Sequence, residues 1–217
     1  MNLRRSLTLA IVILLATAAA ASAATYRVKI TNVTKTQIIS PPVLATHNLG
    51  ASVFTVGETA SDALAALAED ADASGLITAL QGSDNVLDVV QGPGVLMPGA
   101  SVTLDIEANG SFPRLSAVGM LVTTNDAFFG LDSFDIVGGS WLKRVQVPAY
   151  DSGSEANTES CEHIPGPPCG NGGVRVTGGA EGFVHVHQGV HGIGDDLSSF
   201  GYDWRNPSAA ITVIRVN

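Results

Sequence analysis

Two stretches of the sequence concentrate oxygen-bearing side chains of the kind that bind hard cations. Residues 123–130 contain Asn125 and Asp126, and residues 150–159 contain Asp151, Glu155 and Asn157. Calcium takes about six to eight oxygen ligands from carboxylates, amide carbonyls, the backbone and water. Loops that meet at one end of a folded domain can supply such ligands from distant positions. The two stretches therefore define a candidate calcium site, with solvated turn residues as the alternative interpretation.

Four of the five histidines form a second group of candidate metal ligands. His185 and His187 are two residues apart, so on an extended strand their side chains leave the same face. His191 follows four residues later, and His47 lies much earlier in the chain. A His-x-His pair binds zinc or copper when a third ligand approaches. Partly buried, hydrogen-bonded rings without a metal are the alternative, which we favour because the sequence identifies no third ligand.

The chain contains two cysteines, Cys161 and Cys169, separated by a segment rich in proline. In an oxidising compartment such a pair is expected to form a disulfide. A metal-binding or catalytic thiol is the alternative, but no second cysteine pair supports it. We therefore predict a disulfide between the two residues.

The sequence lacks the common signatures of catalysis. It contains no Gly-x-Ser-x-Gly elbow, no His-Glu-x-x-His pair and no phosphate-binding glycine loop. We therefore predict that the protein is not an enzyme. The alternative is a zinc- or copper-binding protein, or a metal-dependent hydrolase, that uses the cluster of His185, His187 and His191.

The N-terminal residues have the organisation of a secretory signal peptide. Arg4 and Arg5 precede an apolar stretch, and Ala21-Ser22-Ala23 supplies the small-x-small pattern of a cleavage site. We predict that residues 1–23 are removed and that the mature chain is secreted or periplasmic. A transmembrane anchor is the alternative, which the shortness of the apolar run and the lack of a stop-transfer cluster disfavour.

The mature chain is acidic. Loss of two arginines with the signal peptide lowers the formal net charge from −9 to −11. Such a chain repels nucleic acid and anionic membrane surfaces, so we exclude both as partners. No later segment is long and apolar enough to span a bilayer, so we expect no membrane span in the mature chain.

The remaining sequence is typical of an all-β domain with many turns, including 24 glycines. Apolar and polar residues alternate over 26–33 and 101–108, as in half-buried strands, and residues 115–124 are mostly apolar. Further strand candidates are residues 141–147, 182–187 and 210–216. We predict one antiparallel β-sandwich domain over residues 24–217.

One segment departs from this pattern. Residues 61–70 are rich in helix formers, and Ser61 or Thr59 can cap them. Their apolar residues fall on one face at helical spacing. A second short helix is expected at residues 74–80. We interpret both as a helical insertion that lies across the sandwich.

Four separated stretches are similar to the spondin N-terminal domain family, including the spondin domain of F-spondin and mindin. They are residues 39–47, 125–132, 147–159 and 182–187, in the order that the family has. The resemblance extends over almost the whole mature chain. It is strongest to bacterial members that consist of this domain alone.

The resemblance implies a C2-like β-sandwich that binds calcium at one end and acts in extracellular matrix attachment and cell recognition. An aspartate of the family that follows a Ser-Pro pair resembles Asp126, and an aromatic-Asp-x-Gly-x-acid segment resembles residues 150–155. The resemblance therefore implies Asp126, Asp151 and Glu155 as the main calcium ligands. Asn125 and Asn157 are secondary candidates.

The chain differs from the animal members of the family at the site itself, where Ala127 replaces a tryptophan, and in its cysteine arrangement. We also expect no thrombospondin-type repeat after the domain. We therefore predict a secreted, non-enzymatic adhesion or recognition module in which calcium rigidifies the loops. Its expected partner is an extracellular protein or glycan, which the sequence does not identify.

Overall fold

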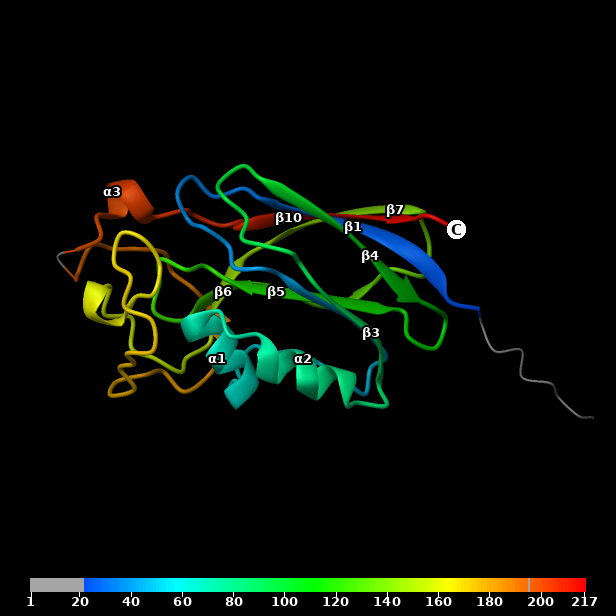
Figure 1. Cartoon of the computed structure of the whole chain (residues 1–217), viewed down its shortest axis with the longest axis horizontal. Helices are drawn as coiled ribbons and strands as arrows, with labels where there is room; N and C mark the ends of the chain where they lie inside the picture. The colour runs from blue at the N-terminus through cyan, green and yellow to red at the C-terminus, as the bar shows by residue number, and fades with distance from the viewer. Residues whose placement is uncertain (1–21, 195) are drawn as a thin grey trace, which may run out of the picture.

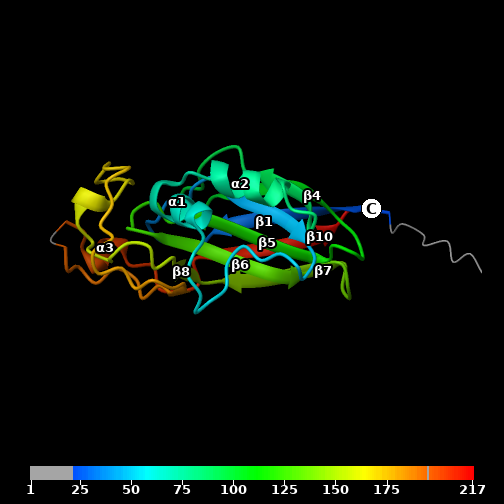
Figure 2. The ribbon, with the colours of Figure 1, turned by 90° about the horizontal axis from the view of Figure 1, so that it is seen from below.

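The computed structural model describes residues 22–194 and 196–217. The predicted signal peptide lies outside the described residues, apart from Ser22 and Ala23, and stays a prediction. Two antiparallel sheets and a pair of helices form three layers (Figures 1 and 2). Across the described ranges, none of the helices has the length and apolar character needed to cross a membrane.

Four strands form the first sheet. In sheet order they are β4 (Ser101–Ala108), β1 (Ala24–Asn32), β10 (Ala209–Arg215) and β7 (Leu142–Val147). Val28 and Ile30 of β1 are fully buried, whereas Arg27 and Lys29 face solvent. This alternation is what a strand with one covered face requires. Because β10 lies between β1 and β7, the C-terminal strand is an internal part of the sheet.

Six strands form the second sheet. In sheet order they are β3 (Val86–Gln91), β2 (Val43–His47), β5 (Arg114–Met120), β6 (Ala127–Asp135), β8 (Ala149–Asp151) and β9 (His185–Val186). Leu44 of β2 belongs to the core between the sheets, while its neighbours Val43 and Ala45 belong to a second core under the helices. The central strands are therefore covered on both faces.

The helical insertion covers the outer face of the six-stranded sheet (Figure 2). It consists of α1 (Asp62–Asp70) and α2 (Ser74–Gln81). Ser61 caps α1, because its side chain accepts a hydrogen bond from the N–H of Leu64 at 3.2 Å. Leu64 and Leu67 are fully buried on the sheet. Glu69, in the last turn of α1, is buried as well, at the end of the sandwich that carries the long loops.

The long loops gather at one end of the sandwich, opposite the start of β1 and the C-terminus (Figure 1). This loop end contains residues 152–184, 187–194 and 196–208, with the short helices η1 (Cys161–His163) and α3 (Ser199–Tyr202). The predicted disulfide between Cys161 and Cys169 is formed there.

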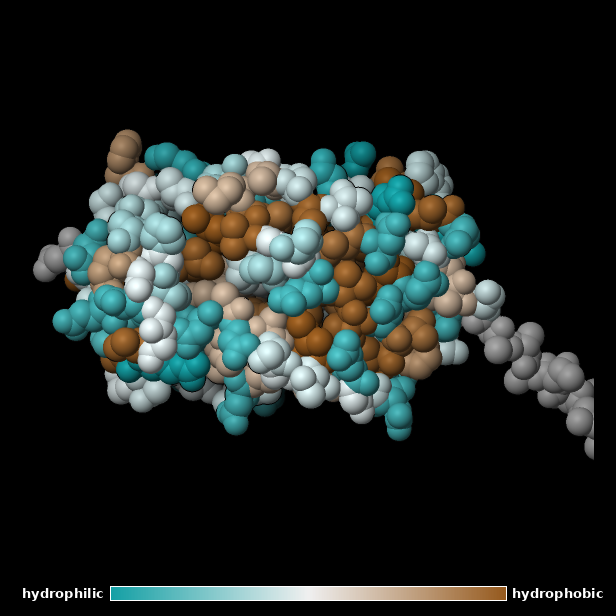
Figure 3. All heavy atoms as spheres, in the orientation of Figure 1, coloured by the Kyte–Doolittle hydropathy of each residue, from teal (hydrophilic) through white to brown (hydrophobic). Residues whose placement is uncertain are grey.

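One long side of the sandwich exposes the edge strands β3 and β4. Hydrophobic side chains gather in the middle of this side, with hydrophilic groups around them (Figure 3). Val90, Val102 and Leu104 of these strands are partly buried against the core. The loop end is mostly hydrophilic in the same view, so the two regions differ in character.

The predicted fold class and helices are confirmed, and several strands were missed. The strands β2, β3, β6 and β8 were not predicted. Residues 125–130 were interpreted as a loop, which is wrong from Ala127 onward because β6 begins there. The strand expected at residues 182–187 is reduced to His185–Val186, since Gly182 has a φ of 80° that interrupts an extended chain.

Candidate cation site at the loop end

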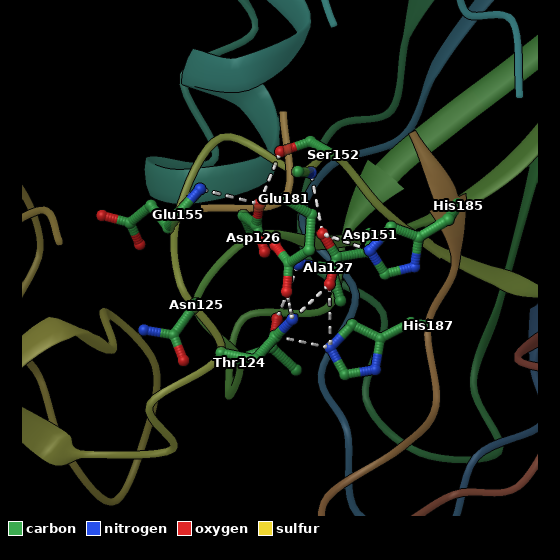
Figure 4. Close-up of polar contacts among 12 residues, drawn as sticks. Thr124, Asn125, Asp126, Ala127, Asp151, Ser152, Glu155, Glu181, His185 and His187 are labelled. Atoms are coloured by element: carbon green, nitrogen blue, oxygen red, sulfur yellow. Dashed lines mark hydrogen bonds and ion pairs between the residues drawn. The ribbon is translucent and has the colours of Figure 1, made fainter. Parts of the chain in front are cut away.

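Asp151 lies at the point where the six-stranded sheet meets the long loops. It pairs with Ala127 of β6 on one side and with His185 of β9 on the other. Its side chain is fully buried, and the rings of His185 and His187 lie next to it (Figure 4). Sheet register thus brings together a carboxylate and two imidazoles from separate parts of the chain.

A single turn wraps the carboxylates of Asp126 and Asp151. The N–H of Gly153 donates to Oδ1 of Asp151 at 2.7 Å. The next two N–H groups along the chain donate to Oδ2 of Asp126 at 2.9 and 3.1 Å. The hydroxyl of Ser152 donates to the same oxygen of Asp126 at 2.8 Å. The two aspartates are therefore held by consecutive groups of one turn (Figure 4).

Gly153 is the residue that lets this turn close. Its φ is 69°, and a Cβ atom at this position would lie 2.3 Å from the carbonyl oxygen of Phe183. Only glycine accommodates both the left-handed backbone and the close approach of a neighbouring chain. The local sequence Asp-Ser-Gly-Ser thus supplies hydrogen-bond donors to both carboxylates, and its glycine allows the backbone to turn around them.

Burial and mutual repulsion raise the pKa values of the carboxyl groups around Asp126. Burial, and next the charge of Asp151, raise the pKa of Asp126 to about 7. Burial also raises the pKa of Asp151. The pKa of Glu155 rises to about 7, chiefly through burial and then through the charges of Glu69 and Asp126. Arg175 acts on both Glu155 and Glu69, and its Nε lies 2.6 Å from a carboxylate oxygen of Glu69.

One buried oxygen of this group has no partner. Among the described residues, nothing donates a hydrogen bond to Oδ1 of Asp126, although that atom is shielded from solvent. A buried carboxylate oxygen of this kind costs free energy unless a proton or a metal ion satisfies it. The carboxylates of Asp126 and Asp151 are the ligand type that calcium takes. These two residues fit a calcium ion, and its charge would offset theirs.

The other three predicted calcium ligands are placed differently. Asn157 lies beside Asp151, to whose Oδ2 it donates a short hydrogen bond. Glu155 contributes its N–H to Asp126, but its carboxylate accepts from the N–H of Val176 at 2.9 Å and points away from Asp126 (Figure 4). The side chain of Asn125 is occupied by residues 158 and 159.

His187 is held as a neutral ring. Burial, and then the charges of His185 and His191, lower its pKa to about 4. Its Nδ1 accepts a hydrogen bond from the N–H of Gly189 at 3.0 Å, so the ring proton is on Nε2. This proton faces the amide oxygen of Asn157 at 3.1 Å. Both ring nitrogens of His187 therefore have protein partners.

The structure does not bring His47 to this group. Its strand position is opposite Arg114, at the start of β5, whereas Asp151 lies next to the strand end at Met120 and Phe128. His47 is fully buried, with Nδ1 2.7 Å from the carbonyl oxygen of Asn48. His191, in contrast, lines the same cavity as His185 and His187.

A cavity of about 540 Å³ opens beside Asp151. Its lining includes the three histidines 185, 187 and 191, together with Asn157 and Glu181. Glu181 was not predicted as a site residue. Its signal in the sequence is its spacing of four from His185, which places both on one face of an extended chain, but the turn at Gly182 masks that pattern.

Comparison with known proteins places the chain in a family. The Spondin_N family model matches residues 25–168. The chain belongs to the Spondin_N family. The protein is thus a spondin-like extracellular domain by family. The match includes Asp126 and Asp151, and it ends before Glu181 and the histidine strand. No curated protein matches the chain.

Proposed function

We propose that this protein is a secreted adhesion or recognition module without catalytic activity, and that one calcium ion rigidifies its loop end. The observation that carries the proposal is Oδ1 of Asp126, a buried carboxylate oxygen for which the described residues supply no donor. Asp126 and Asp151 are the ligands that we assign first. Membership of the Spondin_N family supports an extracellular role.

A calcium ion suits this position better than a proton. At neutral pH a proton would satisfy Oδ1 of Asp126 only part of the time, because the pKa of that carboxyl is about 7. An ion with two charges would offset the mutual repulsion of Asp126 and Asp151 at every pH above that value. Backbone carbonyls and water would complete its six to eight oxygen ligands.

The ion would act on the loops rather than on a substrate. Residues 152–155 already wrap both aspartates, and residues beyond them form the wall of the cavity. Fixing this turn orders the loop that carries Glu181 and Phe183. Phe183, Val186 and Ile193 are 43, 48 and 66% exposed at the cavity, which gives an extracellular protein or glycan an apolar surface to contact.

The arrangement of hydroxyl groups supports a non-enzymatic role. One cluster of serine, histidine and aspartate contains His47, Ser116 and Asp132. Its serine hydroxyl lies between the imidazole and the carboxylate, 2.7 Å from one and 2.9 Å from the other, and is fully buried. A nucleophilic serine needs access to substrate and a histidine that the carboxylate orients. This cluster provides neither.

Hydrogen exchange tests the proposed rigidification directly. With saturating calcium, amides of residues 153–155 should exchange more slowly than in chelator, because the ion holds the carboxylates to which those amides donate. Amides of β1 and β10, at the centre of the other sheet, serve as the internal control and should be unchanged. Equal exchange at residues 153–155 in both conditions would overturn the proposal.

A further inference from the structure

Asp151 belongs to a second group of potential metal ligands, on the side that faces the cavity. One ligand atom each from Asp151, Glu181 and His185 lies within 4.8 Å of the other two. The three residues come from β8, from the loop before β9 and from β9 itself. Asp126 is not a member of this group. Asp151 is thus linked to Asp126 by the turn at Gly153, and to His185 by the pairing of β8 with β9.

The ring of His185 is oriented as a metal ligand would be. Its Nδ1 lies 3.2 Å from the carbonyl oxygen of Val186, and because a carbonyl only accepts, the ring proton is on Nδ1. Its Nε2 therefore carries the lone pair. This atom is shielded from solvent and has no hydrogen-bond partner among the described residues. Phe183 packs on the ring, with centroids 5.3 Å apart, and limits its rotation.

The atom that Nε2 of His185 faces is also an acceptor. Oδ1 of Asp151 lies 3.7 Å away, too far for a hydrogen bond. Two ligand atoms bound at about 2.0–2.2 Å to one tetrahedral ion are about 3.3–3.6 Å apart. The spacing between the two lone-pair atoms is therefore close to what a shared transition-metal ion needs.

The donor types identify the class of ion. A nitrogen and two carboxylate oxygens suit zinc and related divalent ions, whereas calcium takes oxygen ligands alone. His187 is the other ring near Asp151, but its Nε2 carries the proton and faces Asn157. His187 and Asn157 therefore orient Asp151 rather than bind the ion.

We infer that Asp151, Glu181 and His185 form a zinc-type transition-metal site that is separate from the calcium site. Asp151 is the carboxylate that both sites touch. The cavity on the open side of the three ligands leaves room for a water molecule or a group of a bound partner as the fourth ligand. This inference rests on the contacts of His185 and Glu181 and does not require the calcium site to exist.

Metal titration of the calcium-saturated full chain tests the inference. Cobalt(II) serves as the spectroscopic probe, since its visible absorption reports low coordination numbers, and zinc affinity follows by competition. We expect one ion per chain. Glu181→Gln and His185→Gln should each weaken binding at least about tenfold, the minimum for losing a group that supports a metal. Glu181 is exposed, so its replacement is not expected to disturb folding.

Two control variants separate this site from its surroundings. His191→Gln removes a histidine of the same cavity that is outside the three-residue group and should keep wild-type zinc affinity. Asp126→Asn removes the proposed calcium ligand and should keep the zinc site while calcium binding is lost. Far-UV circular dichroism of each metal-free variant confirms that it is folded.

Three results would overturn the inference. The first is wild-type protein that binds no cobalt or zinc when calcium is saturating. The second is equal loss of affinity in His185→Gln and His191→Gln, which would indicate surface histidines acting without Asp151. The third is displacement of zinc by calcium one for one, which would mean that a single site binds both ions.

Discussion

Two clusters that combine aspartate and histidine lie on the six-stranded sheet, and they differ in how completely their polar atoms are satisfied. The closed cluster contains His47, Ser116 and Asp132, at the start of β5. The open cluster contains Asp126, Asp151 and His185, at the loop end. Both include fully buried carboxylates or imidazoles, so burial alone does not distinguish them.

Every ring nitrogen and carboxylate oxygen of the closed cluster has a partner. Oδ1 of Asp132 accepts from the N–H of Val53 at 2.8 Å and lies 2.9 Å from the Ser116 hydroxyl. Its Oδ2 accepts from two further serine hydroxyls. The ring nitrogens of His47 each have a partner at 2.7 Å. Such a network stabilises the fold, because each of these atoms has a partner within the protein.

The open cluster lacks partners at two buried atoms, Oδ1 of Asp126 and Nε2 of His185. Both atoms offer lone pairs, and both lie beside Asp151 (Figure 4). Native proteins rarely leave such atoms unpaired, and the exceptions are concentrated at sites for ions or for chemistry. The comparison supports our proposal that cations are the missing partners of the open cluster, whereas the atoms of the closed cluster have partners within the protein.

The largest expected effect is calcium-dependent stability. At a free calcium concentration about 1,000 times the dissociation constant, the free energy of unfolding of the wild type should rise by about 4 kcal/mol, because the ion binds only the folded protein. Asp151→Asn should abolish this rise. Denaturant unfolding in calcium and in chelator measures it. Asp132→Asn, in the closed cluster, is the matched control and should keep the full calcium-dependent rise despite lower stability. Loss of this rise in both variants would show that the closed and open clusters do not differ in their response to calcium.

The next effect is the pH dependence of the calcium-free protein. The pKa of Asp126 is about 7 in the folded protein and 3.8 when unperturbed. The folded state thus keeps a proton that the unfolded chain has released, so the free energy of unfolding falls as pH rises from about 4 to about 7. At about 1.4 kcal/mol for each unit of pKa difference, the full loss is on the order of 4 kcal/mol.

Denaturant unfolding in chelator across this pH range measures that loss. Asp126→Asn should make the profile shallower, and added calcium should do the same, because either change removes the uncompensated charge of Asp126; Glu155, whose pKa is also raised to about 7, keeps part of the slope. A profile that is equally steep in Asp126→Asn would show that the charge of Asp126 is not responsible.

A smaller effect is expected in the closed cluster. Ser116→Ala removes the hydroxyl between His47 and Asp132 and the acceptor of the Ser133 N–H. Leaving these buried groups short of a partner should lower the free energy of unfolding by about 2 kcal/mol. The loss should be identical with and without calcium in denaturant unfolding. A loss that appears only with calcium would show that the two clusters are coupled.

The smallest effect concerns helix α1, whose last turn brings Glu69 next to the open cluster. Ser61→Ala removes the cap at the other end of the helix and should cost about 1 kcal/mol. Thermal unfolding measures this change. The gain in stability from calcium should stay the same, because the cap is far from the aspartates along the helix. A smaller stabilisation by calcium in Ser61→Ala would show that the whole of α1 is coupled to the open cluster.

Much of the fold could be predicted from periodicity, and the exceptions have a physical cause. β1, β4 and β10 each have one covered face, so their apolar residues alternate. β2 and the first half of β6 are buried on both faces and carry no such alternation. β8 and β9 are too short for any period to show.

The candidate site could be predicted in part. The turn at residues 150–155 concentrates oxygen ligands, and the family resemblance pointed to Asp126, Asp151 and Glu155. Neither observation could show that the carboxylate of Glu155 is directed to Val176. His47 was grouped with the other histidines because a sequence does not tell which end of a sheet a strand end occupies. Sheet register decides that, and it brings Glu181 in while leaving His47 out.

Calorimetric titration of calcium into chelator-treated wild-type protein and the Asp126→Asn variant is the most direct test of the central claim. We predict one calcium ion bound per wild-type chain and none by Asp126→Asn, with Asp132→Asn binding as the wild type does. Absence of calcium binding by the wild type, or equal binding by all three proteins, would contradict the assignment of the unpartnered Asp126 oxygen to a cation.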